Sequence, residues 1–357
     1  ISLIFRESYL SNELVSSWYA RKLENLNRAD FLLAISESSG REAEEHLGFP
    51  GERIVNISGA ADPKFRRIDV RPDESERLKT TYRISRPFVL CAPGGFDHHK
   101  NVDGLIRAWA LLPDRIRNTH QLVIASRVQK ATQRRLDKIR KKAGLGRNDV
   151  VFTGYVPDSD LIRLYNLTEL CVFPSRHEGF GLPALEAMSC GAPTIGSNSS
   201  AVPEVIGRED AMFDPEDPAG FARLVEELLE APDRRAELSR FALERAPLFS
   251  WDKSARLAIA GMERLAGDRA ERPAPASPRP DRLAIVAPST DLRGDAAHRL
   301  LALLPDLSWR YRIDIVAASE GSDPARLPEG ATASLSLEEF RSSAQRYDRV
   351  LYCLGDT

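Results

Sequence analysis

Short apolar runs alternate with amphipathic helical stretches between residues 84 and 230, and this alternation most restricts the fold. Strands that alternate with helices form βαβ units, which assemble into a parallel, doubly wound sheet. The sequence therefore predicts an α/β domain in this region. The predicted strands are Phe88–Ala92, Leu122–Ala125, Val150–Thr153, Leu170–Phe173, Thr194–Gly196 and Ala211–Phe213. The predicted helices are Val102–Leu112, Ala131–Lys142, Asp158–Leu167, Pro183–Met188 and Pro218–Leu229.

The segment before this domain carries the pattern of another α/β unit. It is predicted to contain a helix over Glu13–Leu26, a strand over Ala29–Ser36, a helix over Ser38–Leu47 and a strand over Arg53–Ser58. Either Ser36 or Ser38 is expected to cap the second of these helices. Residues 1–66 are thus interpreted as the closing portion of a domain.

The segment after residue 233 begins with two helical stretches that are broken near Pro247–Ser250. Four prolines then fall between Asp268 and Asp281, and such a composition predicts an exposed, semi-stiff linker. Beyond it the sequence predicts a few further elements, too few to complete a domain of this kind. These elements are strands over Arg282–Ala287, Arg312–Ala317 and Arg349–Leu354, and a helix over Gly294–Leu304.

Composition excludes several classes of protein. A formal net charge of -2 gives no electrostatic footprint for nucleic acid, so no nucleic-acid partner is expected. The sequence has no run of eighteen apolar residues, so no membrane-spanning helix is predicted. The cysteines show no CxxC spacing and are predicted to be buried free thiols in a reducing compartment. They are Cys91, Cys171, Cys190 and Cys353.

The histidines do not have the spacing of metal ligands, and no metal site is predicted. His98 and His99 are expected at the surface or at the rim of a site. The chain begins at Ile1 and stops just after a strand pattern, so we expect it to be a fragment of a longer polypeptide.

Residues 174–191 carry the pattern with the most chemical content. Glu178 and Glu186 are separated by seven residues, and Gly179, Phe180, Gly181 and Leu182 lie between them, before Pro183. Proline is well suited to start a helix, and the amides at a helix N-terminus can bind a phosphate or a sugar hydroxyl. Carboxylates beside these amides would repel a bare phosphate but would accept hydrogen bonds from hydroxyl groups. The pattern therefore favours a sugar-nucleotide site over the simpler alternative of a tight turn.

A second glycine-rich loop supports this interpretation. Gly94 and Gly95 follow the first predicted strand, and Ser175–Leu182 follow the fourth. In parallel sheets, ligands bind outside the carboxyl ends of the strands, so both loops are expected at the binding edge.

These segments, in their order, resemble the retaining glycosyltransferases of family 4, which have the GT-B fold. The pair Glu178 and Glu186 is similar to the E-x7-E motif of that family, and the resemblance covers residues 1–265. The other matching segments are Ala34–Ser38, Ala60–Phe65, Gly94–Asn101, Phe152–Val156, Ser199–Glu204 and Phe249–Trp251.

The resemblance implies a division of the chain. It comprises the end of an acceptor-side Rossmann-like domain (1–66), a complete nucleotide-sugar-binding Rossmann-like domain with a parallel sheet (67–233), C-terminal helices (234–266) and a proline-rich linker (267–281). The remaining residues (282–357) look like the truncated start of a second glycosyltransferase. The parent is thus interpreted as a tandem enzyme, of which this fragment alone is expected to be inactive.

The resemblance also implies roles for residues. Lys100 is expected to contact the pyrophosphate, Glu178 the hydroxyls of the transferred sugar, and Glu186 the ribose. Glu178 and Lys100 are the expected catalytic residues. Gly94 and Gly95 would permit close backbone approach, Val156 would lie beside the base, and the amides of Gly179, Phe180, Gly181 and Leu182 would complete the site.

Some positions depart from the family pattern or stay open. Much of the family has an arginine where Gly95 stands, and Arg176 or His98 is a candidate to replace that cation. Asp97 is expected to face either the acceptor or its own loop. Glu204 is expected to cap the helix that starts near Pro203, and no special role is assigned to His177.

The expected reaction is transfer of a hexose from a nucleotide-diphosphate sugar to a hydroxyl of a growing glycan, without a metal or other cofactor. The glycine-rich loop resembles those of bacterial mannosyl- or rhamnosyltransferases, and GDP-mannose is the favoured co-substrate. The acceptor would be a glycan or lipid-linked glycan, and the parent would be cytoplasmic, at the inner face of a membrane. The main alternative is a non-catalytic GT-B module that organises a larger polysaccharide synthase. A nicotinamide-dependent oxidoreductase is disfavoured, because no GxGxxG follows the first strand.

Overall fold

The structure is a computed structural model. It describes residues 19, 22, 23, 25, 26, 29–271, 281–287, 311–317, 333–336 and 349–352, with side chains only as far as residue 264. Contacts divide the chain into two units, Ile1–Leu265 and Ala266–Thr357. The predicted helix Gly294–Leu304 lies outside the described residues, and so does most of the predicted helix Glu13–Leu26.

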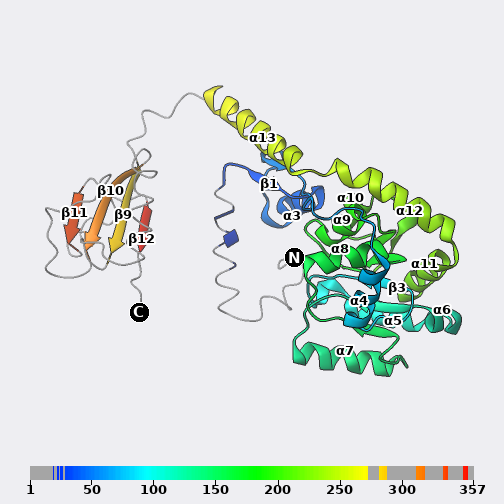
Figure 1. The fold of residues 1–357 in the computed structure, drawn as a ribbon. Coiled ribbons are helices and arrows are strands. Elements are labelled where there is room, and N and C mark those ends of the chain that lie inside the picture. The colour runs from blue at the N-terminus through cyan, green and yellow to red at the C-terminus, as the bar shows by residue number, and fades with distance from the viewer. Residues whose placement is uncertain are drawn as a thin grey trace. The chain divides into compact units, whose positions relative to one another are not determined.

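The first unit is built on a six-stranded parallel sheet (Figure 1). The order β5-β4-β3-β6-β7-β8 is that of a doubly wound sheet, as the sequence predicted. Each of the six strands predicted between residues 84 and 230 is present, with ends shifted by a residue at most. The strands are β3 (Phe88–Cys91), β4 (Gln121–Ile124), β5 (Val150–Phe152), β6 (Leu170–Phe173), β7 (Thr194–Ser197) and β8 (Met212–Phe213).

Helices cover this sheet. All five predicted helices are present, but α4 and α6 were not predicted. Pro72 and the acceptor side chain of Glu74 start α4, whose sequence is too polar to show a clear apolar stripe. The helices are α4 (Pro72–Tyr82), α5 (Val102–Ala110), α6 (Asp114–Thr119), α7 (Lys130–Lys142), α8 (Asp158–Leu167), α9 (Leu182–Ser189), α10 (Val202–Ile206), α11 (Pro218–Glu230), α12 (Pro232–Arg245) and α13 (Trp251–Glu271).

Each face of the sheet has its own apolar core, because successive strand side chains point to opposite faces. On β3, Val89 and Cys91 belong to the cluster that includes α5 and α11. Phe88 and Leu90 belong to the cluster that includes α4 and α8. This two-sided burial explains why the central strands are continuous apolar runs.

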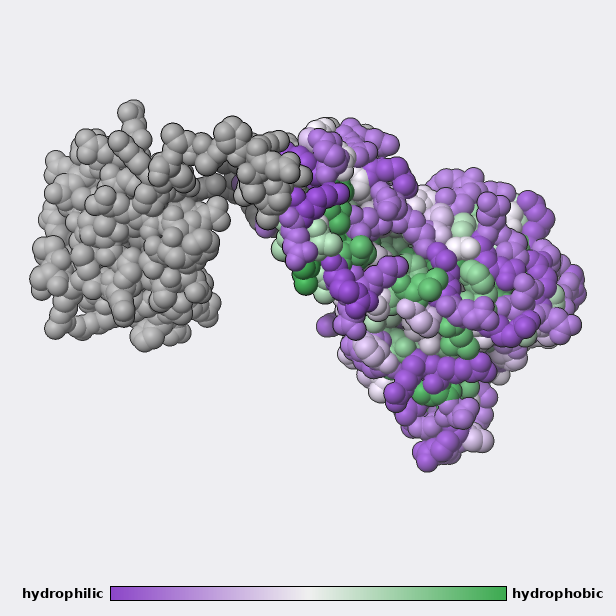
Figure 2. All heavy atoms as spheres, turned by 90° about the horizontal axis from the view of Figure 1, so that it is seen from above, coloured by the Kyte–Doolittle hydropathy of each residue, from purple (hydrophilic) through white to green (hydrophobic). Residues whose placement is uncertain are grey.

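The N-terminal segment forms a small βαβ unit. Strands β1 (Leu32–Ala34) and β2 (Ile54–Asn56) are parallel, and α3 (Glu37–Leu47) connects them. Ser36 caps α3, since its hydroxyl accepts from the Ser39 N–H at 2.9 Å. Apolar residues of this unit, among them Ile35, line a cavity of about 380 Å³. The face drawn in Figure 2 is mainly hydrophilic, with hydrophobic residues gathered in a few strips between polar ones.

The second unit contains a four-stranded parallel sheet of order β11-β10-β9-β12. This order repeats that of β5-β4-β3-β6 in the first unit. Strand β11 was not predicted. Helix α13 continues to Glu271, so the predicted linker is helical in its first residues, which precede Pro273. The strands are β9 (Asp281–Ala287), β10 (Tyr311–Ala317), β11 (Ala333–Ser336) and β12 (Arg349–Tyr352).

Asp160 joins α8 to α4 and should make stability depend on pH. Its carboxylate accepts from Tyr82 Oη at 2.8 Å and from Arg77 Nη2 at 2.7 Å. The hydrogen bond from Arg77 and then that from Tyr82 lower the pKa of Asp160, against the opposing effect of burial. A lowered pKa stabilises the fold above the unfolded value and loses that effect as the pH falls through the folded value.

We therefore expect Asp160→Asn to lower the free energy of unfolding by about 1 kcal/mol at pH 7, and by less in acid. Urea unfolding at several pH values measures this. Asp73→Asn, at an exposed position of α4, is the control and should change stability by less than about 0.5 kcal/mol. An equal loss for Asp160→Asn at every pH would contradict the expectation.

Candidate functional site

The site lies where the order of the sheet reverses. Strands β3 and β6 are neighbours, yet the chain leaves β3 toward β4 on one side and β6 toward β7 on the other. Their carboxyl-terminal loops are therefore adjacent at a topological switch point, where doubly wound sheets bind ligands. The loop after β3 carries Gly94 and Gly95, and the loop after β6 carries Glu178.

Lys100 and Glu178 meet across these two loops. The Nζ of Lys100 donates to Oε1 of Glu178 at 2.8 Å, and their side chains are only 15% and 10% exposed. Lys100 ends the short 3-10 turn His98–Lys100, which leads into α5. An ammonium has three protons to donate, so one hydrogen bond to Glu178 leaves capacity for an anion.

Hydroxyl groups at the end of β7 and directly after it hold the loop of Glu178 in place. Ser197 Oγ donates to Ser175 O at 2.5 Å, and Ser199 Oγ donates to Arg176 O at 2.6 Å. The N–H of Glu178 donates to Ser200 Oγ at 2.7 Å. The loop is thus anchored through its backbone, which leaves the Glu178 carboxylate to Lys100.

Helix α9 starts at Leu182, one residue before the predicted Pro183. Gly181 precedes it with φ of 112°, a conformation that favours glycine. The side chain of Phe180 is buried, with its ring 5.7 Å from that of Phe249 in an edge contact. Phe180 can therefore reach a ligand only through its main chain, whereas Leu182 is 41% exposed.

Glu186 lies further along α9, in different surroundings from Glu178. Burial, and then the charge of Asp158, raise the pKa of Glu186 to about 7, although Lys64 opposes this. Lys64 is itself shared between Asp62 at 3.2 Å and Asp158 at 2.9 Å. The two glutamates of the motif thus lie beside different charges: Glu178 beside a lysine, and Glu186 beside an acidic cluster.

The glycines after β3 are open to approach. Gly94 has φ of 70°, and no atom lies within 4 Å of the place a Cβ would take. The carboxylate of Asp97 lies 3.8 Å from the corresponding position at Gly95, so Asp97 lies over its own loop. Val156 is buried in the core cluster of α8, which leaves its main chain as the part that could face a base.

Arg176 is already engaged by the protein. The Nε of its side chain pairs with Glu216, and Nη1 donates to His98 O at 3.1 Å. Its main-chain N–H donates to His99 O at 2.7 Å. Of the two candidates for a second cation, Arg176 would have to leave these partners to meet a phosphate. His98 lies in the exposed part of the same turn.

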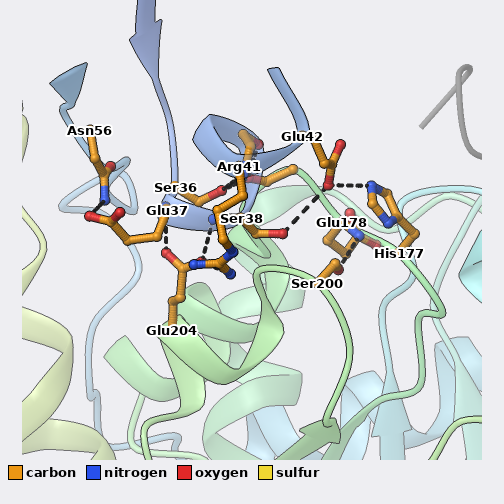
Figure 3. A network of polar contacts seen from close by, with 12 residues as sticks. Ser36, Glu37, Ser38, Arg41, Glu42, Asn56, His177, Glu178, Ser200 and Glu204 are labelled. Carbon is orange, nitrogen blue, oxygen red and sulfur yellow. Dashed lines mark hydrogen bonds and ion pairs between the residues drawn. The ribbon is translucent and has the colours of Figure 1, made fainter. Parts of the chain in front are cut away.

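Glu204 has a different role from the expected one (Figure 3). Its carboxylate accepts from the N–H groups of Glu37 at 2.8 Å and Ser38 at 2.7 Å. It therefore caps α3 rather than its own helix, α10, which has no side-chain cap. Only five residues long, α10 presents Glu204 to the neighbouring helix instead.

His177, to which no special role was assigned, also contacts α3. Its Nε2 lies 3.0 Å from Oε1 of Glu42, and its side chain is 7% exposed (Figure 3). Burial raises the pKa of Glu42, but the hydrogen bond with His177 and the nearby positive charges together outweigh this effect and lower that pKa. The only sequence signal for this contact is that α3 carries polar residues, Glu42 among them, that could pair with a histidine.

Three cysteines, Cys91, Cys171 and Cys190, are buried free thiols, as predicted, and burial raises the pKa of each. Cys353 lies outside the described residues. In the part of the chain that the structure describes, no cluster of three acidic, histidine or cysteine side chains could hold a metal ion. Across the same residues, no helix is long and apolar enough to cross a membrane.

Comparison with known proteins shows which proteins this domain is similar to. Residues 74–245 match the model of the family described as Glycosyl transferases group 1. The chain is 41% identical over 265 residues to the serotype-specific mannosyltransferase WbdA of Escherichia coli, which covers 74% of this chain but 32% of WbdA. It is 31% identical over 229 residues to O-antigen chain mannosyltransferase B of Escherichia coli, covering 64% of this chain and 59% of that protein. The chain thus spans about a third of the length of WbdA.

Solved structures share the fold. Sucrose-phosphate synthase from Thermosynechococcus elongatus has a TM-score of 0.59 at 23% identity, covering 69% of this chain and 61% of its own. Anabaena HepE in complex with UDP and glucose has a TM-score of 0.59 at 20% identity, covering 70% and 66%. The fold is therefore that of the GT-B glycosyltransferases, and residues 74–245 are similar to the Glycosyl transferases group 1 family.

Proposed function

We propose that this domain binds a nucleotide-diphosphate sugar and transfers its hexose, with retention of configuration, to a hydroxyl of a growing glycan. The observation that carries the proposal is the pairing of Lys100 with Glu178 at the switch point, beside the N-terminus of α9. The pairing supports a site that can meet a diphosphate with a cation and sugar hydroxyls with a carboxylate.

The proposed roles follow from charge. As the glycosidic bond breaks, negative charge develops on the departing diphosphate. Lys100 and the amides of Phe180, Gly181 and Leu182 would stabilise that charge. Glu178 would accept from hydroxyls of the sugar, and Glu186 from the ribose. Gly94 and Gly95 would allow the backbone to approach the phosphates.

Mannose is the proposed sugar and GDP the proposed nucleotide. The support is the likeness to two relatives that are named mannosyltransferases, one of them an O-antigen chain enzyme. We place the reaction in polysaccharide biosynthesis, with a glycan or lipid-linked glycan as acceptor, no cofactor, and a location at the inner face of a membrane.

We further propose that the second unit begins another glycosyltransferase in the same polypeptide. Its support is the strand order β11-β10-β9-β12, which repeats the order at the start of the first sheet. The length of WbdA, about three times that of the matched region, agrees with a parent that has more than one such unit.

A panel of sugar nucleotides tests the proposal. The full-length polypeptide that contains this chain should release GDP from GDP-mannose faster than it releases UDP from UDP-glucose or UDP from UDP-galactose, when a mannose-containing glycan is present. Glu178→Gln, which keeps the shape but removes the charge, should abolish most of the activity of this unit. If the polypeptide turned over none of these sugar nucleotides and bound no nucleotide, the non-catalytic module would be favoured instead.

A further inference from the structure

Helix α3 is tied to the loop that carries Glu178 by hydroxyl groups (Figure 3). Ser36 Oγ donates to Gly179 O at 2.7 Å, and Ser39 Oγ donates to the same oxygen at 3.0 Å. Two hydroxyls on one carbonyl use both of its lone pairs. The Gly179–Phe180 peptide is therefore fixed from a segment that lies about 140 residues earlier in the chain.

This fixed peptide sets the direction of one amide. In a planar trans peptide the N–H points away from the C=O of the same plane. With Gly179 O held against α3, the Phe180 N–H is directed to the opposite side of the peptide. The Phe180 N–H makes no hydrogen bond with any of the described residues. Backbone N–H groups of folded proteins are rarely left without a partner, so this one has capacity for a ligand.

The position of α3 is in turn held by the same domain. Glu204 places its carboxylate on the first amides of α3, where a negative charge is favoured by the helix dipole. Glu42, one turn further along, pairs with His177 of the Glu178 loop. Helix α3 is thus joined to the Glu178 loop and to α10 by separate polar contacts.

We propose that Ser36 and Ser39 are positioning residues that aim the Phe180 amide at the sugar-diphosphate end of the bound nucleotide sugar, and that Glu204 anchors the helix carrying them. The inference rests on the proposed function, because it assumes that a nucleotide sugar occupies the site. It adds that residues of the acceptor-side segment set the geometry of the site that binds the nucleotide sugar.

Calorimetric titration of the chain with GMP, GDP and GDP-mannose tests this. Ser36→Ala/Ser39→Ala should weaken GDP-mannose binding by about tenfold, the loss of roughly one oriented hydrogen bond. GMP, held at its nucleoside end, should bind within about twofold of the unchanged protein. Ser39→Thr alone, which keeps both hydroxyls, should bind GDP-mannose as tightly as the unchanged protein. Glu204→Ala should likewise weaken GDP-mannose binding but not GMP binding. Weaker GDP binding by these variants would show that the amide contacts phosphate, and unchanged GDP binding would show that it contacts the sugar.

Ser189→Ala is the matched control, since its hydroxyl also donates to a backbone carbonyl, Leu185 O at 2.8 Å, but lies away from α3. It should leave all three affinities unchanged. Ser36 also caps α3, so urea unfolding verifies that each variant is folded under the titration conditions. The positioning role would be refuted if the double variant bound GDP-mannose normally, or if it lost GMP and GDP-mannose affinity by the same factor. Failure of the unchanged protein to bind any of the three would instead refute the proposed function, and the positioning role with it.

Discussion

Replacing Lys100 with alanine in the full-length polypeptide is expected to lower the turnover rate of this unit by about two to three orders of magnitude. Loss of one group that stabilises developing charge commonly costs that much. The 2.8 Å contact with Glu178 adds to the expectation, because the substitution also leaves a carboxylate that is 10% exposed without its cation. Steady-state kinetics with GDP-mannose measures the change.

Two control variants separate charge from geometry. Lys79→Ala removes a lysine of α4 that is 43% exposed and pairs only with Glu76 among the described residues, and it should leave turnover unchanged. Lys100→Arg keeps the charge but alters its shape, so it should retain more activity than Lys100→Ala. If Lys100→Ala turned over at the rate of the unchanged unit, the role assigned to this ammonium would be wrong.

Replacing Glu186 is expected to change nucleotide binding and stability in opposite directions. Two charge-assisted hydrogen bonds to a ribose diol are worth about 3 kcal/mol, so Glu186→Ala should weaken GDP binding on the order of 100-fold. Because the pKa of Glu186 is raised to about 7, GDP binding to the unchanged protein should also weaken as the pH falls from 8 to 6. Glu186→Gln should lose this pH dependence.

The stability effect follows from the same raised pKa. A group whose pKa is higher in the folded state favours folding at low pH, and that contribution is lost as the pH rises through the folded value. The charged Glu186 therefore opposes folding above about pH 7. At pH 8, the free energy of unfolding of Glu186→Gln, measured with urea, should exceed that of the unchanged protein by about 2 kcal/mol. At pH 4 the two free energies should be nearly equal. A destabilised Glu186→Gln at pH 8 would contradict the assigned pKa shift.

The sheet and the shared edge of the Gly94–Gly95 and Ser175–Leu182 loops could be predicted from sequence because both follow from rules that act along the chain. Continuous apolar runs such as Leu170–Phe173 identify buried parallel strands, and the residues after each strand lie at one edge. Helix α4 escaped prediction because polar residues dominate it and its apolar positions are few.

The contacts of α3 could not be predicted in the same way. Ser36 could be recognised as a helix cap, but no spacing in the sequence shows that its hydroxyl reaches Gly179 O. Glu204 next to Pro203 has the local pattern of a residue that stabilises its own helix. Its actual partners, the amides of Glu37 and Ser38, are more than 160 positions away. Such pairings arise from packing of whole segments and become visible only in the folded chain.

The central claim is that a nucleotide diphosphate binds beside Lys100 and the start of α9, with Glu186 on its ribose. Calorimetric titration of the chain with GDP at pH 8 tests this most directly. We expect one site per chain, with binding weakened by Lys100→Ala and by Glu186→Ala but not by Lys79→Ala. Binding that is indifferent to both Lys100→Ala and Glu186→Ala, in variants that remain folded, would contradict it.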